Sequence, residues 1–530
     1  MIRDFKRVVP ILIILLVAGC NFPSARPTPT ATELPTEEAT LTLAPTITLT
    51  PPPTASATAS FTPSLTAIPP TVTPTSPPTA TPTATTPVTP SATPFPTVAF
   101  VGDRLQQVDL AKQVRDGVGR QWVSFIAINQ TSPTGTPGTQ VAATDSEAVY
   151  IVSPDAVSRF KVIDLPASTD RRVFWSPNGA YLAYLIVEGD APGLYVLDIR
   201  AGATSRLFAL RDFTPRGFAI QPIWSPDSKE LLLMLPTAYD MDIFSVAPDG
   251  SNFRNLTENG AFDLWPAWSP DSTAIVFVSD RAACPTWQPN TSQTCDGAKT
   301  PAGGGLYVMD VSSRQVRQLS EQWVSAPPRW ITASKVAFTT AQPDSPDAGS
   351  SLWWVDARAG TTPTQITASV EAATPRFATN DSWSPDGNRV VYQETAGDTR
   401  VLLRDSTGQE VARGSGFSFP RYLFAAAWSP DGQKIVLGGR NGQCPAGMLI
   451  LDPALKPILA VPVGASTPGI CDPVWSADGK YIAYVGTSRG GSRDGRIDIY
   501  AAEASGYGSK LLSNKISGQL RFLGWIRGGA

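Results

Sequence analysis

Short apolar runs with two-residue alternation recur along residues 99–530, and a tryptophan followed by a tight turn recurs among them. In a representative unit, Trp428 is followed by Ser-Pro-Asp-Gly and then by the apolar run 434–437. Pro presets φ in such a turn, Asp bonds to the local backbone, and Gly accepts a positive φ. The pattern predicts units of four short antiparallel strands, which we name a to d in chain order.

The tryptophan unit repeats along the chain. Six copies read Trp-Ser-Pro or Trp-Ser-Ala followed by Asp or Asn, one copy is degenerate, and one lies at the end of the sequence. The repeat tryptophans are Trp175, Trp224, Trp268, Trp330, Trp383, Trp428, Trp475 and Trp525. Their spacing of 44–62 residues, with four strands in each unit, predicts an all-β fold of the β-propeller type.

The two ends of the repeat region complement each other. Trp525 provides an a strand with no b, c or d strand after it, whereas the apolar runs 122–129, 148–153 and 159–165 provide b, c and d without an a strand. We therefore predict eight blades, with the C-terminal strand closing the N-terminal blade. Seven blades is the alternative, if residues 118–170 pack outside the ring.

The unit that begins at Trp268 shows the clearest family resemblance. It continues as Ile-Val-Phe-Val-Ser-Asp-Arg at 275–281 and as Leu-Tyr-Val-Met-Asp at 306–310. This resembles the TolB-like, WD-type propeller repeat, and also the propellers of the dipeptidyl peptidase and prolyl oligopeptidase families. The resemblance covers about 120–530 and implies a fold rather than an activity. Those peptidases carry a separate hydrolase domain, which we do not expect here.

The N-terminus is typical of an export signal. Arg3, Lys6 and Arg7 precede a short apolar stretch that ends in Leu-Val-Ala-Gly-Cys20. This ending resembles the lipobox of bacterial lipoproteins, which implies cleavage before Cys20 and attachment of lipid to its sulfur. Residues 1–20 are thus predicted to be a lipoprotein signal peptide; the alternative is an ordinary signal peptide with an incidental cysteine.

Residues 21–98 have a different composition from the rest of the chain. They contain 19 Pro and 24 Thr among 78 residues, with very few charges. Such a segment cannot bury enough apolar surface to offset its ordering entropy. We predict a disordered Thr/Pro-rich spacer at 21–98, followed by the TolB-like β-propeller at 99–530.

Composition excludes several chemistries. The 42 basic and 45 acidic residues give a net charge of −3, which provides no broad electrostatic footprint for nucleic acid. The sequence contains no histidine, so it excludes Ser-His-Asp and Cys-His triads and any His-ligated zinc site. We expect no metal, no cofactor and no catalytic residue.

Beyond Cys20, the four remaining cysteines are an even number in a chain predicted to be exported, which favours disulfides. Cys284 and Cys295 share one b–c insertion. Cys444 falls in a b–c loop and Cys471 in the following d–a loop, and these loops emerge on the same face of a blade. The predicted pairs are Cys284–Cys295 and Cys444–Cys471; four free buried thiols remain the alternative.

The same face repeats an aromatic residue six positions before several motif tryptophans, with charged residues beside it. The candidate ligand-binding residues are Arg216, Phe218, Phe262, Asp263, Arg376, Phe377, Arg421 and Tyr422. Arg offers bidentate hydrogen bonds and aromatic rings offer contact area, so this set suits a peptide, an extended tail or a sugar polymer. The alternative is that each aromatic packs against the next blade. The Asp residues of the a–b turns lie on the opposite face, where turn capping explains them.

The leading hypothesis is a non-catalytic, monomeric propeller that binds envelope proteins or peptides. It would be exported and anchored by its lipid in the membrane, facing the extracytoplasmic space, either the cell surface or the periplasm. One alternative is binding of cell-wall glycan. Another is a His-independent glycosidase or lyase, which needs two carboxylates ~5–10 Å apart. Asp263, Asp381 and Asp472 lie near inner strands, but at different positions relative to their tryptophans.

Overall fold

The computed structural model describes residues 106–526 except 131–144, 166–168, 188–190, 210–220, 238–239, 283–302, 341–350, 359–361, 368–380, 395–399, 418, 420–422, 441–443, 445–446, 461–468 and 488–496. All described residues belong to the unit Pro90–Ala530. The predicted signal peptide, Cys20 and spacer lie outside the described residues. One short helix, α1 (Lys112–Arg115), accompanies the strands in the described part.

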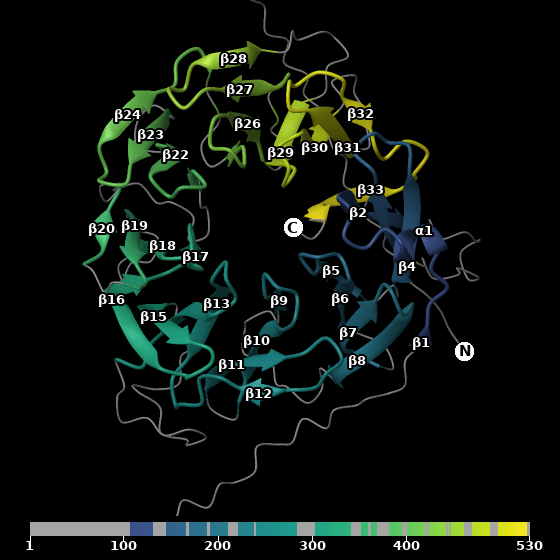
Figure 1. The fold of residues 1–530 in the computed structure, drawn as a ribbon, viewed down its shortest axis with the longest axis horizontal. Helices are drawn as coiled ribbons and strands as arrows, with labels where there is room; N and C mark the ends of the chain where they lie inside the picture. The colour runs from purple at the N-terminus through teal and green to yellow at the C-terminus, as the bar shows by residue number, and fades with distance from the viewer. Residues whose placement is uncertain are drawn as a thin grey trace, which may run out of the picture. The chain divides into compact units, whose positions relative to one another are not determined.

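The described strands form eight successive four-stranded antiparallel blades around a ring (Figure 1). Blades 1 to 4 contain, in the order a to d, β33 (Gln519–Ile526), β2 (Trp122–Gln130), β3 (Asp145–Val152) and β4 (Arg159–Leu165); β5 (Thr169–Trp175), β6 (Tyr181–Ile186), β7 (Gly193–Asp198) and β8 (Ala203–Ala209); β9 (Ile223–Trp224), β10 (Leu231–Pro236), β11 (Met241–Val246) and β12 (Arg254–Asn255); β13 (Asp263–Trp268), β14 (Ala274–Ser279), β15 (Gly304–Asp310) and β16 (Val316–Val324).

Blades 5 to 8 contain β17 (Arg329–Trp330), β18 (Lys335–Thr340), β19 (Ser351–Asp356) and β20 (Thr364–Gln365); β21 (Asp381–Trp383), β22 (Arg389–Gln393), β23 (Val401–Asp405) and β24 (Glu410–Arg413); β25 (Phe424–Trp428), β26 (Ile435–Gly439), β27 (Leu449–Leu451) and β28 (Pro457–Ala460); β29 (Gly469–Trp475), β30 (Tyr481–Thr487), β31 (Ile497–Glu503) and β32 (Lys510–Leu511). An additional strand, β1 (Gln106–Gln107), pairs with β8 at the outer edge of blade 2. The degenerate unit at Trp330 therefore forms a blade like the others.

The ring closes between the two ends of the repeat region. Strand β33 pairs antiparallel with β2, from Trp122 opposite Ile526 to Ile128 opposite Gln519. In Figure 1 the yellow C-terminal strand lies beside the blue N-terminal strands of the same blade. Because β33 provides the a strand that blade 1 lacks, the prediction of eight blades closed by the C-terminus is confirmed.

The Ser-Pro-Asp turns explain why each a strand leads directly into a b strand. In blade 3, Ser225 donates its hydroxyl to Asp227 Oδ1 at 2.7 Å, and the amide of Glu230 donates to Ser225 Oγ at 3.0 Å. The last turn position has a positive φ, 67° at Gly432, and Ser228 adopts 62° at the equivalent position. Such hydrogen bonds within the turn agree with the predicted capping role of the repeated acids. Asp271 of blade 4 in addition accepts a hydrogen bond from Arg358 of blade 5.

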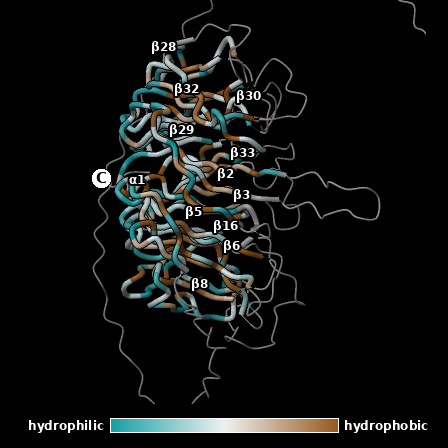
Figure 2. The backbone as a smooth tube through the Cα atoms, turned by 90° about the vertical axis from the view of Figure 1, so that its right-hand side faces the viewer, coloured by the Kyte–Doolittle hydropathy of each residue, from teal (hydrophilic) through white to brown (hydrophobic). Residues whose placement is uncertain are grey.

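The hydrophobic core lies between blades as well as within them. One cluster joins Leu185 and Phe208 of blade 2 with Leu233 of blade 3, all at most 1% exposed. Another joins Phe125 of blade 1 with Ile499 of blade 8, across the closure. In the side view of Figure 2, hydrophobic stretches concentrate in the strands, and the turns at the left-hand face are hydrophilic. Each blade therefore buries both faces against its neighbours, which holds the inner strands in place.

Candidate functional site

The a strands lie nearest the centre of the ring, as β5, β9, β13, β17 and β29 show in Figure 1. Two of them contain a bulge three residues before the motif tryptophan, where Trp265 and Asp472 adopt positive φ values of 52° and 47°. A proline follows each, at Pro266 and Pro473. Proline cannot donate to the strand ladder and bulges redirect side chains, so these two positions interrupt regular pairing at the inner strand.

At one bulge, charged side chains of neighbouring blades meet. Asp472 lies in β29 of blade 8, and Arg440 directly follows β26 of blade 7. Arg440 Nε lies 3.9 Å from Asp472 Oδ1, and the two side chains are 38% and 49% exposed. Burial raises the pKa of the Asp472 carboxyl, and Arg440 opposes this shift. The pair is therefore open to solvent and offers both signs of charge.

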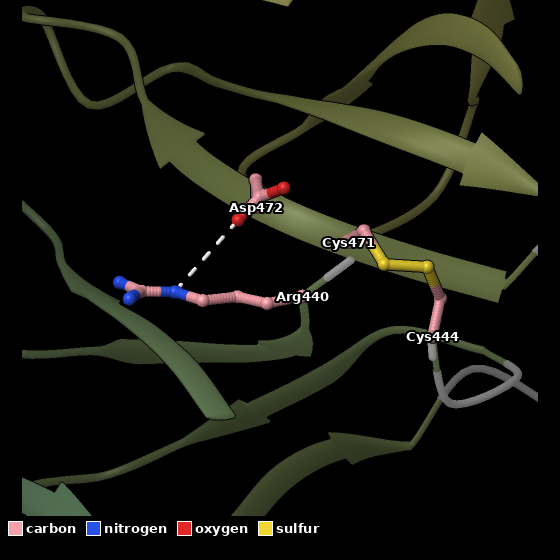
Figure 3. Close-up of a disulfide and its surroundings, with 4 residues drawn as sticks. All are labelled: Arg440, Cys444, Cys471 and Asp472. Carbon is pink, nitrogen blue, oxygen red and sulfur yellow. Dashed lines mark ion pairs between the residues drawn. A yellow bond between two sulfur atoms is a disulfide. The ribbon is translucent and has the colours of Figure 1, made fainter. Parts of the chain in front are cut away.

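A disulfide fixes this place in the ring. Cys444 and Cys471 are bonded, with their Cα atoms 5.0 Å apart, and a parallel bridge pairs Gly439 with Cys471 across the same two blades. The pairing is the one predicted, but Cys471 lies in β29 and not in a d–a loop, because the strand begins two residues earlier, at Gly469. Figure 3 shows Arg440 and Asp472 pointing toward one another beside the disulfide. We call Arg440, Cys444, Cys471 and Asp472 the blade 7–8 site.

The other two acids noted near inner strands are also paired with arginines, but they are buried. Asp263 is 0% exposed and accepts two hydrogen bonds from Arg281 Nη2, at 2.9 and 3.0 Å. Asp381 is 6% exposed; it contacts Arg329 of blade 5 and accepts a 3.0 Å hydrogen bond from Trp383 Nε1. Of the three, only Asp472 is substantially exposed. The described residues thus bring together no open pair of these three carboxylates for acid–base chemistry.

Blades 3 and 4 contain a cluster of buried carboxyl groups, of which Asp242 and Asp280 were not predicted from the sequence. Burial raises the pKa of Asp242 well above its ordinary value, with Asp263 and Asp240 adding to the shift. Burial also raises the pKa of Asp280 to about 6, although the carboxylate accepts a 2.8 Å hydrogen bond from the Phe262 amide. These acids stabilise loops between the blades through hydrogen bonds to Asn255, Thr257 and Phe262.

The structure describes few of the candidate ligand-binding residues. Phe262 is 6% exposed and packs in a hydrophobic cluster with Met241, Leu264 and Val278, the arrangement given as the alternative. Asp263 is the buried partner of Arg281. The remaining candidates and the other cysteine pair lie outside the described residues: Arg216, Phe218, Arg376, Phe377, Arg421, Tyr422, Cys284 and Cys295.

Two further observations apply to the described residues alone. They contain no group of three or more Cys, Asp or Glu side chains arranged to hold a metal ion. Among them, no helix has the length and apolar character needed to cross a membrane.

The arginines of the ion pairs were not among the residues predicted from the sequence; they are Arg281, Arg329 and Arg440. A usable signal for the inner bulges was present, because proline stands two residues before the motif tryptophan in four of the eight units. These prolines are Pro222, Pro266, Pro328 and Pro473. A proline within an apparent central strand indicates a bulge or an edge, so the pattern marks where side chains leave the regular ladder.

Comparison with known proteins places these repeats in a known class. Residues 172–285 match the TolB beta propeller domain. The chain is 36% identical to a TolB homolog of Chlorobium luteolum over 110 residues, which is 21% of this chain and 24% of the relative. It is 37% identical to the Tol-Pal system protein TolB of Bordetella pertussis over 111 residues, 21% and 24% of the two chains. The chain thus matches about a quarter of the length of these relatives.

Solved structures with a similar fold include an oligogalacturonate lyase from Vibrio parahaemolyticus, at 16% identity and a TM-score of 0.38, covering 72% of this chain and 97% of the lyase. TolB from Acinetobacter baumannii matches at 14% identity and a TM-score of 0.28, covering 63% of this chain and 78% of that one. The blades and their closure define an eight-bladed β-propeller protein. Its repeats are TolB-like, as the sequence predicted.

Proposed function

We propose that this chain is a cell-envelope protein whose propeller binds protein or peptide partners without catalysing a reaction. The match of residues 172–285 to the TolB beta propeller domain carries the proposal. A Bordetella pertussis relative is named as a Tol-Pal system protein, which agrees with a binding role in the envelope. The absence of histidine from the sequence supports binding over hydrolysis, because it removes the common general base.

The blade 7–8 site is the surface we assign to the partner. Asp472 and Arg440 present an acceptor and a donor group that are both partly exposed, which suits the polar groups of a peptide. The Cys444–Cys471 bond limits movement of the strand that carries Asp472. A surface held in its binding geometry loses less entropy when a partner binds, and this favours affinity.

A binding assay with immobilised full-length protein and envelope extract tests the assignment. The double variant D472A/R440A should lose the captured protein, because both charged groups of the site are removed. The matched control E410A/R413A removes an exposed ion pair, 2.8 Å long, from the outermost strand of blade 6 and should capture as the unchanged protein does. Equal capture by both variants, or retention on purified cell-wall glycan alone, would contradict the proposal.

We further propose that Cys20 carries the lipid and that residues 21–98 act as a spacer between membrane and propeller. The sequence Leu-Val-Ala-Gly-Cys20 after an apolar stretch supports lipid attachment. Metabolic labelling with an alkyne fatty acid should label the chain, and C20S should abolish the label. If the C20S variant still takes up the fatty-acid label, the proposal is wrong.

A further inference from the structure

A pocket lies between blades 2 and 3, and none of the roles above involves it. Its volume is about 290 Å³, and its walls include Tyr181, Val196 and Ser205 of blade 2. Asp198 of blade 2 and Asp249 of blade 3 also line the pocket. The pocket is partly open to solvent and large enough for the end of a long side chain.

The walls of this pocket suit a cation. The ring of Tyr181 is stacked on Trp224, with centroids 5.7 Å apart and planes 16° apart. Burial raises the pKa of Tyr181, and the charges of Asp198 and Asp249, which line the same pocket, raise it further. Hydrogen bonding to Ser251 lowers the pKa of Asp249, so this carboxylate is ionised at neutral pH.

Each of the two carboxylates has one oxygen that can accept a hydrogen bond from a ligand. Asp198 Oδ1 accepts from the amide of Ala201 at 2.9 Å. Asp249 Oδ1 accepts from the amide and hydroxyl of Ser251, at 2.9 and 2.6 Å. In the described part of the chain, these turn bonds engage Oδ1 of each residue and leave Oδ2 for a ligand. Arg200, the nearby positive charge, is exposed and acts weakly in the opposite direction on Tyr181.

The neighbouring blade shows which group occupies the same place elsewhere in the ring. Ser205 pairs with Val196, which pairs with Ala183, eight residues after the motif tryptophan of blade 2. In blade 3, Arg254 pairs with Ser245, which pairs with the residue eight positions after Trp224. Arg254 therefore occupies the position that Ser205 occupies in blade 2.

In blade 3 this arginine fills the space. Arg254 Nε donates to Ser245 Oγ at 3.0 Å, and Nη2 lies 2.9 Å from Glu230 Oε1. Glu230, six residues after Trp224, is the equivalent of Tyr181, six residues after Trp175. Blade 4 again has arginine at this d-strand position, where Arg317 pairs with Val308. Blade 2 has a short serine instead, and the pocket lies there.

We propose that the pocket between blades 2 and 3 binds the guanidinium group of an arginine side chain from a partner peptide. The guanidinium lies against Tyr181 and Ser205 and donates to Asp198 and Asp249, much as Arg254 serves its own blade. The proposal rests on this pocket and is independent of the blade 7–8 site. Its test therefore fails or succeeds separately from the capture assay above.

Isothermal titration calorimetry of the full-length protein with N-acetyl-arginine amide tests the proposal. N-acetyl-citrulline amide, a neutral isostere, is the matched ligand control. The arginine compound should bind at least ~5-fold more tightly, since a hydrogen bond to a charged group contributes more than a neutral one. Equal affinity for the two compounds, or no binding of the arginine compound, overturns the proposal. An arginine-containing tripeptide with lower affinity than the single amide would also contradict a peptide source.

Two variants locate the binding. In S205R the new guanidinium should occupy the pocket, as Arg254 does at the equivalent position of blade 3. This variant should therefore lose binding of the arginine compound, and its thermal unfolding midpoint should not change. D249N removes one carboxylate charge and should weaken binding by ~3- to 10-fold. D405N is the control, because Asp405 caps a c–d turn of blade 6 in the same way, through Thr407, and lies away from the pocket. Unchanged binding in S205R and D249N, or equal losses in D249N and D405N, overturns the proposal.

Discussion

At the scale of single residues, most of the motif tryptophans join their blade to the one before it. Six of them donate Nε1–H to a backbone carbonyl in the preceding a strand, always the residue before its tryptophan. The pairs are Trp224 with Phe174, Trp268 with Ile223, Trp330 with Ala267, Trp428 with Ser382, Trp475 with Ala427 and Trp525 with Val474, at 2.9–3.2 Å. The sequence predicted the repeat itself. It could not predict these bonds, because each joins residues 45–63 positions apart.

We predict that Trp428→Phe lowers the free energy of unfolding by about 1–3 kcal/mol. The change keeps an aromatic ring but leaves the Ser382 carbonyl without its 3.0 Å hydrogen bond, at a side chain only 8% exposed. Urea unfolding followed by circular dichroism measures the effect. Tyr507→Phe, at a residue that is 52% exposed, is the control and should leave stability unchanged. Equal stability of the Trp428 variant would contradict this role.

Asp280 gives a prediction for pH dependence. Burial raises its pKa from the ordinary 3.8 to about 6, so the folded state holds a proton that the unfolded state has lost between these two values. Stability from this group is therefore full below pH 3.8 and is lost as pH rises through about 6. Asp280→Asn keeps an acceptor for the Phe262 amide and should raise stability at pH 7 by roughly 1–2 kcal/mol, with little effect at pH 3.5. An equal change at both pH values would contradict the assignment.

At the scale of strands and blades, local patterns were predictable and contacts between blades were not. The a, b, c and d strands follow from turn chemistry and alternation, and even the degenerate unit at Trp330 pairs as expected. The repeated aromatic residue was a weak guide to a ligand site. Phe262, six residues before Trp268, is buried against neighbouring hydrophobic residues. The Arg440–Asp472 pair depends on how one blade is placed beside the next, which periodicity does not encode.

The Cys444–Cys471 bond joins blades 7 and 8 over a sequence separation of 27 residues. Closing a loop of this size constrains the unfolded chain and contributes about 3 kcal/mol. We predict that C444A/C471A lowers the free energy of unfolding by this amount and also weakens partner capture. Chemical unfolding of both proteins under non-reducing conditions measures the first effect. Unchanged stability would show that the bond adds nothing to the joint between these blades.

At the scale of the whole ring, the strand that closes it was predicted from the sequence, because one end of the repeat region lacks an a strand and the other end provides one. Truncation after Gly518 removes β33 and uncovers Val123 and Phe125, which are 0% exposed. We predict that this truncation abolishes cooperative unfolding and makes the chain sensitive to protease. Truncation after Ile526 leaves β33 intact and is the matched control. A cooperative transition that survives loss of β33 would contradict closure by the C-terminal strand.

The proposed binding of an envelope protein to the blade 7–8 site can be tested in intact cells. Photo-crosslinking in intact cells tests it most directly, with a photoreactive amino acid at position 472 and a control at Val411, which is 53% exposed on the outermost strand of blade 6. We predict a discrete adduct with an envelope protein from position 472 and none from position 411. No adduct at 472, or the same adducts from both positions, would contradict it.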